Sequence, residues 1–93
     1  MVNIEVKRTD HDDRYEFQVT VKEGKEESRH RVTLRKADYQ KLTAGKASPE
    51  DLVMESFRFL LEREPKESIL RSFDLMVIGR YFPKYRREIV KRL

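Results

Sequence analysis

The longest helix of the chain is predicted by the stretch SPEDLVMESFRFLL, residues 48–61. Ser48 precedes Pro49, and a capping serine followed by proline at the first helical position is a strong signal for a helix start. Two acidic side chains follow in the first turn, where the helix dipole favours negative charge. Pro65 ends the helix at residue 63 or 64, because proline lacks a backbone N–H and restricts the residue before it.

This helix has two apolar strips. At about 100° per residue, the wide one faces away from the charged side chains and is expected to cover a β-sheet. Leu52 and Phe59 lie outside it and form a second strip. We expect this second strip to be covered by residues 73–82 or by a second copy of the chain, so Leu52 and Phe59 are candidate interface residues. The wide strip consists of Val53, Met54, Phe57, Leu60 and Leu61.

The first 35 residues alternate apolar and polar side chains with a period of two, the pattern of strands with one buried face. The alternation occurs in three segments, 2–7, 15–21 and 31–35. Short polar stretches at 9–13 and 23–27 separate them and suit hairpin loops. The sequence therefore predicts a three-stranded antiparallel β-meander in this region.

Beyond residue 35 the apolar spacing becomes helical. A short helix is predicted at 37–43, ending near Gly45, and a helical turn at 66–72. Asp74 can cap a further short helix, and Pro83 begins the last one. The helical part therefore extends to the C-terminal end of the sequence.

Together these patterns predict a single α+β domain, residues 1–93. Residues 1–35 form the β-meander, and residues 36–93 form four to five helices, the longest of which packs on the sheet. A chain of this size buries only a small core, so self-association as a homodimer is one way to bury more apolar surface.

The composition indicates a folded domain with a heavily charged surface, since 41% of the residues are charged and 38% are hydrophobic. No apolar run approaches the roughly 18 residues of a membrane-spanning helix, and the first residues lack the pattern of a signal peptide. The absence of cysteine excludes disulfides and thiolate metal sites. We expect a cytoplasmic protein that does not contact membranes.

No catalytic motif occurs, so we expect no enzyme, no cofactor and no metal site. The cluster at 10–13, Asp-His-Asp-Asp, lacks the later ligand and glycine of a calcium loop and is predicted as a hairpin turn. His30 is predicted at the surface. Residues 45–48, Gly-Lys-Ala-Ser, lack the earlier glycine and the adjacent hydroxyl of a phosphate-binding loop. A small hydrolase or transferase site built from loop carboxylates is the enzymatic alternative.

The positive charge is concentrated at the C-terminus. The chain carries a net charge of +4, and residues 73–93 alone contain six basic and two acidic side chains, a balance of +4. The cations alternate there with aromatic residues, a mixture that can neutralise phosphates and stack on bases. Core packing is the simpler explanation for the aromatics Tyr81, Phe82 and Tyr85. The candidate nucleic-acid contacts are Arg80, Lys84, Arg87 and Lys91.

Residues 31–64 resemble the ribbon-helix-helix DNA-binding family. The resemblance rests on the strand RVTLR at 31–35, a short helix, and then a long helix capped by Ser48. It implies that the outward residues Arg31, Thr33 and Arg35 read the major groove, while the N-terminus of the second helix meets a phosphate. The two preceding strands can also complete the ribbon within the chain.

Over its length the chain also resembles a small bacterial protein family of unknown function. The resemblance is plainest in SPEDL at 48–52, in residues 57–70 and in RYFP at 80–83. It implies a stand-alone bacterial domain and carries no activity. We predict a non-enzymatic binding or regulatory module with an unknown partner. The alternative is a nucleic-acid-binding protein that uses the basic C-terminal helix or the ribbon-like strand.

Overall fold

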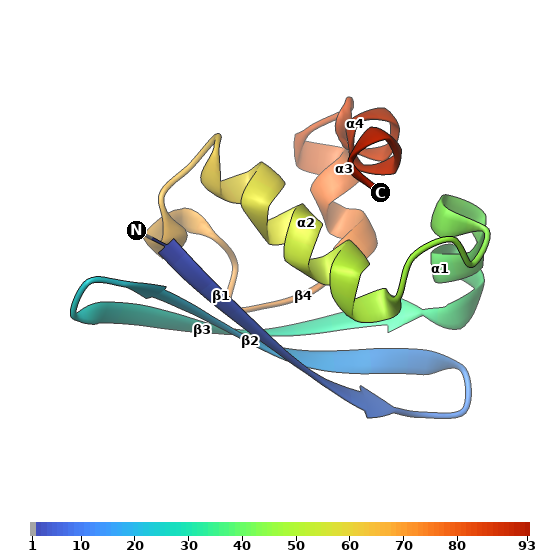
Figure 1. Cartoon of the computed structure of the whole chain (residues 1–93), viewed down its shortest axis with the longest axis horizontal. Coiled ribbons are helices and arrows are strands. Elements are labelled where there is room, and N and C mark those ends of the chain that lie inside the picture. Colours follow the sequence, from blue (N-terminus) through green and yellow to red (C-terminus); the bar gives the residue numbers. More distant parts are fainter. Residues whose placement is uncertain (1) are drawn as a thin grey trace.

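The computed structural model describes residues 2–93 and places three long antiparallel strands in the first part of the chain (Figure 1). These are β1 (Val2–Asp10), β2 (Arg14–Glu23) and β3 (Glu26–Arg35). The register sets Val6 opposite Val19 and Phe17 opposite Val32, so the apolar residues of neighbouring strands share one face. The predicted meander is confirmed, and the cluster at 10–13 forms its first turn.

A fourth strand corrects the predicted three-stranded sheet. β4 (Ser72–Asp74) lies parallel to β3, and the sheet order is β1-β2-β3-β4. The backbone N–H of Arg31 donates to the carbonyl of Arg71 at 2.7 Å. The predicted helical turn at 66–72 is confirmed only at residues 66–68, because residue 72 belongs to β4. A strand of three residues is too short to display an alternating pattern. Pairing with a distant strand decides their conformation.

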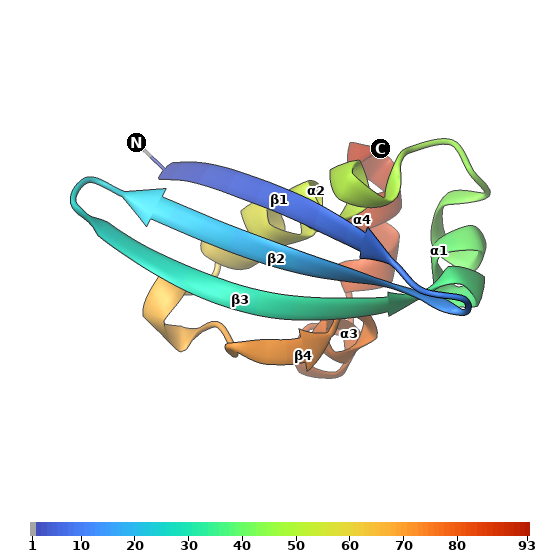
Figure 2. The same cartoon turned by 90° about the horizontal axis from the view of Figure 1, so that it is seen from below.

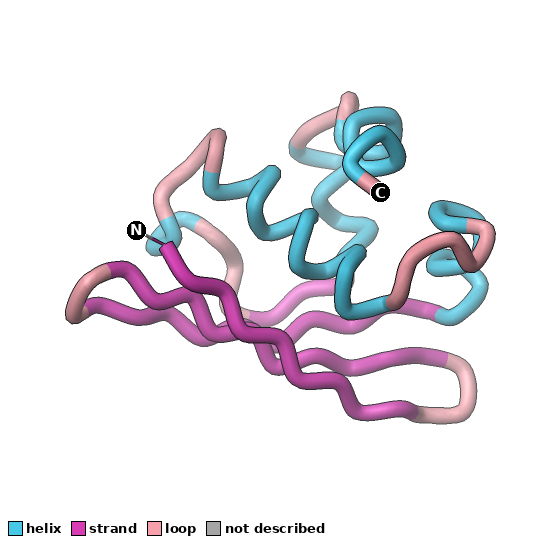
Figure 3. Tube along the Cα trace, in the orientation of Figure 1, coloured by secondary structure: helices cyan, strands magenta, loops and turns pink. Residues whose placement is uncertain are grey.

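Four α-helices and two short 3-10 turns complete the α+β fold (Figure 3). α2 starts as predicted, because the Ser48 hydroxyl accepts the backbone N–H of Asp51 at 3.0 Å. α2 ends at Leu61, two to three residues before the predicted end at residue 63 or 64. The bounds are α1 (Lys36–Thr43), α2 (Pro49–Leu61), η1 (Lys66–Ser68), η2 (Leu75–Val77), α3 (Ile78–Tyr81) and α4 (Tyr85–Arg92).

The helices cover one face of the sheet and leave the other face open (Figure 2). α2 crosses the covered face, and its Phe57 is fully buried with its ring 6.1 Å from that of Phe73 in β4. The strands contribute Phe17, Val19 and Val32 to the same core. As predicted, the longest helix therefore packs on the sheet.

The second apolar strip of α2 is covered within the chain. Leu52 and Phe59 are fully buried, and the Phe59 ring lies 5.8 Å from Phe82 and 5.4 Å from Tyr85. The Tyr85 hydroxyl lies 2.6 Å from the hydroxyl of Ser56. Phe59 is therefore covered by the C-terminal segment, extended by Tyr85, and both residues of the strip are buried without a second copy of the chain.

His30 is a second correction, because its residue is only 4% exposed. It lies on the same face of β3 as Val32 and Leu34, with its ring 5.3 Å from Phe57. Nδ1 lies 2.8 Å from the carbonyl oxygen of Leu70, and Nε2 lies 2.8 Å from the hydroxyl of Ser28.

Within residues 2–93, no helix is long and apolar enough to cross a membrane.

Candidate nucleic-acid interface

The C-terminal segment is fixed to the body of the protein by its buried residues. The Asp74 carboxylate accepts the backbone N–H of Met76 at 3.0 Å and so caps η2. Tyr85 and Ile89 are fully buried on the inner side of α4. At its end, Arg92 donates to Glu62 at 2.6 Å and joins α4 to the C-terminal end of α2. This anchoring determines which side of α4 faces solvent.

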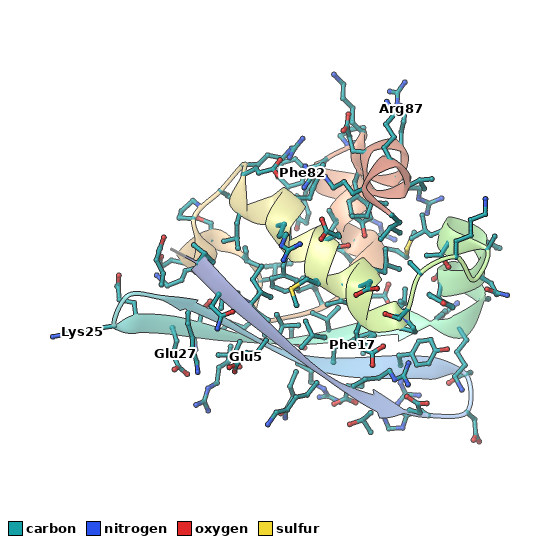
Figure 4. The ribbon with its side chains drawn as sticks, viewed as in Figure 1. Glu5, Phe17, Lys25, Glu27, Phe82 and Arg87 are labelled. Carbon is teal, nitrogen blue, oxygen red and sulfur yellow. The ribbon has the colours of Figure 1, made fainter. Side chains whose placement is uncertain are left out.

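Five cations of this segment are exposed and have no carboxylate partner within residues 2–93. None of the ion pairs formed by the described residues includes them, whereas Arg92, the sixth cation, is paired with Glu62. Figure 4 shows Arg87 projecting away from the molecule on the helical side. We call this set the C-terminal basic surface. It consists of Arg80, Lys84, Arg86, Arg87 and Lys91.

Four of the five cations of α4 and its N-cap, all except Arg92, lie around its exposed side. With 3.6 residues per turn, Lys91 and Lys84 lie about 40° and 60° to one side of Arg87, and Arg86 lies about 100° to the other side. Val90, which is also exposed, lies between Arg86 and Arg87. The predicted residues Lys84, Arg87 and Lys91 therefore lie together, whereas Arg80 in α3 lies on the Arg86 flank.

Arg80 and Arg86 share a hollow with Arg35, which we call the arginine hollow. It has a volume of about 580 Å³ and lies between the end of β3, the start of α1, and α3 and α4. A Cβ atom at Gly79 would lie 3.9 Å from Nε of Arg86, so the Arg86 side chain extends over α3. The other lining residues are Asp38, Asp74, Met76, Val77, Gly79 and Pro83.

The two acidic residues of the arginine hollow form no ion pair with its arginines. Asp74 accepts the Thr33 hydroxyl and the backbone N–H of Met76, both at 3.0 Å. Asp38, in the first turn of α1, has no side-chain hydrogen bond within the described part of the chain. Three guanidinium groups therefore face the hollow without a carboxylate partner.

Sequence reasoning missed Arg86 and did not connect Arg35 to this site. The sequence predicted Arg35 only as an outward residue of the strand, and it did not distinguish Arg86 from the rest of the basic segment. Residues 35 and 80 are far apart in the sequence, so no linear spacing brings them together. Strand alternation was the only available signal for Arg35.

Two of the three aromatic residues of the C-terminal segment lie in the core as expected, and the third is exposed. Phe82 and Tyr85 pack on Phe59, and burial raises the pKa of the Tyr85 hydroxyl well above its usual range. Tyr81, which we expected in the core, is 66% exposed. Its ring lies at the edge of an apolar groove beside the end of α2, not in the arginine hollow that Arg80 lines.

The open face of the sheet carries most of its charges as ion pairs. Arg31 donates to both carboxylate oxygens of Glu16, at 2.9 and 3.1 Å, and this contact lowers the pKa of Glu16. The other pairs on this face are Lys22 with Glu5 at 3.4 Å and Arg29 with Glu27 at 3.0 Å.

The ribbon-like strand residues all lie on this open face. Arg31 and Thr33 point outward but are engaged by Glu16 and Asp74, whereas Arg35 forms no ion pair within residues 2–93. β3 itself lies between β2 and β4, so its residues 31–33 are paired on both edges within the chain. Arg35 therefore lies where the open face of the sheet meets the arginine hollow.

Two other features bear on the kind of site. In the described part of the chain, residues 2–93, no three His, Asp or Glu side chains are grouped so that they could hold a metal ion. An apolar groove of about 310 Å³ lies beside the end of α2, with Leu70 and Tyr81 exposed at its edge.

The chain was compared with family models, curated proteins and solved structures, and none matches it. Its function must therefore be inferred from its own residues.

Proposed function

We propose that this protein is a nucleic-acid-binding module that contacts phosphates through the C-terminal basic surface and Arg35. The observation that carries the proposal is a set of six exposed cations over α3, α4 and the end of β3, none of which forms an ion pair in the described part of the chain. On the open face of the sheet, by contrast, Lys22, Arg29 and Arg31 are paired with neighbouring carboxylates, and the other unpaired cations, such as Lys7 and Lys46, lie apart from this group.

The physical basis is the release of counterions from the nucleic acid. Each phosphate that is neutralised by a lysine or arginine releases condensed cations, and this entropy drives binding without regard to base sequence. Six contacts would give a log–log slope of affinity against salt of about −4 to −5. An anionic partner suits this surface better than an apolar one because its five cations outnumber the exposed Val90 and the carboxylate of Glu88 on the same helix.

The test is the retention of single- and double-stranded oligonucleotides at about 50 mM salt, where phosphate contacts are strong. Replacing Lys84, Arg87 and Lys91 together by Gln should reduce the steepness of the salt slope by about 2 to 3, because three contacts are lost. All three side chains are exposed, so the fold should survive, which circular dichroism can check.

A matched control removes the same charge from the far end of the sheet. Lys22, Lys25 and Arg29 belong to the β2–β3 hairpin, and Figure 4 shows Lys25 at the opposite end of the molecule from Arg87. Replacing these three by Gln should leave most of the affinity and the slope intact. An equal loss in both triple variants would mean that net charge alone attracts the nucleic acid. Absence of binding by the wild-type protein would refute the proposal.

A further inference from the structure

We propose that the arginine hollow binds the terminal phosphate of a nucleic-acid strand, whereas the outer side of α4 contacts bridging phosphates. This inference rests on the proposed function and specifies the group that one part of the surface recognises. It follows from three features of the hollow: its donors, its shape and the engagement of its acidic residues.

The donors come from three separate elements. Arg35 ends β3, Arg80 belongs to α3 and Arg86 belongs to α4. Each guanidinium is a planar fork of N–H donors that matches two phosphate oxygens. A bridging phosphodiester offers two non-bridging oxygens and one negative charge, whereas a terminal phosphate offers three oxygens and about −1.5 to −2 charges at neutral pH. The three arginines of the hollow can therefore donate to the three oxygens of a terminal phosphate.

The shape of the site separates it from the rest of the basic surface. Lys84, Arg87 and Lys91 lie on the convex side of a helix, where a strand can pass along them. The arginine hollow is a depression of about 580 Å³ walled by Met76, Val77 and Pro83. This volume is within the range of small-ligand sites and is sufficient for a terminal phosphate with its sugar.

The acidic residues leave the hollow positive overall. Three arginines face two carboxylates, and both oxygens of Asp74 already accept hydrogen bonds from Thr33 and Met76. Asp74 is thereby held in place without forming an ion pair to an arginine. Asp38 is the remaining carboxylate, and it lies at the α1 edge of the hollow beside Arg35. An incoming phosphate therefore does not have to break an existing ion pair.

The experiment compares three versions of one internally labelled single-stranded 12-mer. One carries a 5′-phosphate, one a 3′-phosphate, and one has hydroxyls at both ends. Dissociation constants are measured by fluorescence anisotropy at about 50 mM salt. We expect one phosphorylated strand to bind about tenfold more tightly than the hydroxyl strand, equivalent to about 1.4 kcal/mol. Whichever end gives the gain identifies the source of the phosphate.

Variants locate the effect. Arg35→Gln and Arg86→Gln should each remove most of the tenfold preference while the hydroxyl strand still binds, whereas Lys25→Gln should change neither. The triple Gln variant at 84, 87 and 91 should bind all three strands more weakly and keep the preference. This result would separate recognition of the terminal group from general charge attraction.

The failures are distinguishable. Equal binding of all three strands would overturn the terminal-phosphate site and leave the proposed function in place. A preference that survives both Arg35→Gln and Arg86→Gln would overturn its assignment to the hollow. If no strand binds, the proposed function fails and this inference fails with it.

Discussion

His30 is a titratable side chain that is buried against the aromatic ring of Phe57. Burial beside Phe57 lowers its pKa, and the charge of Arg71 acts in the same direction, while the hydrogen bond to the Leu70 carbonyl opposes them. Since Leu70 directly precedes the segment that pairs with β3, His30 ties that segment to the sheet. Its protonation state therefore bears on the attachment of β4.

The lowered pKa predicts a loss of stability in mild acid. Above about pH 6.5, the ordinary pKa of histidine, His30 is neutral in both states and its contribution to folding is fully present. As the pH falls below that value, the unfolded chain takes up a proton that the folded chain resists. The free energy of unfolding should then fall by at most about 1.4 kcal/mol per pH unit until the pKa of the folded state is reached.

Denaturant titrations between pH 7.5 and 5 measure this slope. His30→Gln removes the titrating ring and should flatten the curve in this interval, although it lowers stability throughout. His11→Gln is the control because His11 lies at the first turn, partly exposed. An unchanged slope in His30→Gln would show that other groups control the acid response.

Lys66 is also nearly buried, but unlike His30 it is surrounded by carboxylates, which favour its charged form. Its residue is only 4% exposed, and its Nζ lies 3.0 Å from Glu67, 3.3 Å from Glu23 and 3.7 Å from Glu26. The hydrogen bond to Glu67 is the largest of the contacts that raise the pKa of Lys66. Three carboxylates therefore hold the ammonium charged and connect η1 to the β2–β3 hairpin.

At the scale of elements, α2 joins both layers of the fold. One side packs on the sheet through Phe57, and another packs on the C-terminal segment through Phe59. Its first turn is fixed by Ser48. Truncating a buried side chain should therefore cost far more than removing the cap.

We expect Phe57→Ala to lower the free energy of unfolding by about 3 to 5 kcal/mol, because it leaves a cavity at a fully buried position. Ser48→Ala should cost about 1 kcal/mol, the typical value of an N-cap. Urea titrations monitored by circular dichroism give both values. Equal and negligible losses would contradict the role assigned to α2.

The sequence predicted those elements that local signals define. The cap at Ser48, the stop before Pro65 and the alternation of β1 to β3 all lie within a few residues of the structure they specify. β4 was missed because its pairing with Arg31 to Thr33 bridges some 40 positions of sequence. The burial of His30 was missed for another reason. The alternation of β3 places His30 on the same face as Val32 and Leu34, but a polar side chain was expected at the surface.

At the scale of the whole molecule, the charged side chains differ between two surfaces. Most charges on the open sheet face are in ion pairs, whereas five exposed cations over α3 and α4 form no ion pair within residues 2–93. The sequence located the excess at the C-terminus but could not bring in Arg35, because only the fold places the end of β3 beside α3 and α4. The layering of sheet, α2 and α4 therefore determines both the core and the candidate site.

The last prediction tests this layering through Leu52 and Phe59. Both are buried within the chain, so replacing both by Glu would force two carboxylates into the interface between α2 and the C-terminal segment. A buried charge without a partner is costly enough to exceed the stability of a small domain. We expect the double variant to lose cooperative unfolding in circular dichroism.

Sedimentation separates this outcome from the loss of a dimer. If the strip is covered only by the chain itself, the wild-type protein and an Arg58→Gln control on the exposed side of α2 should sediment identically, and the double variant should expand as an unfolded chain. A double variant that stays folded and changes from dimer to monomer would instead assign Leu52 and Phe59 to contact between copies. In that case the C-terminal segment must detach from α2, and the arginine hollow, which needs α3 and α4 in place, would be lost as well.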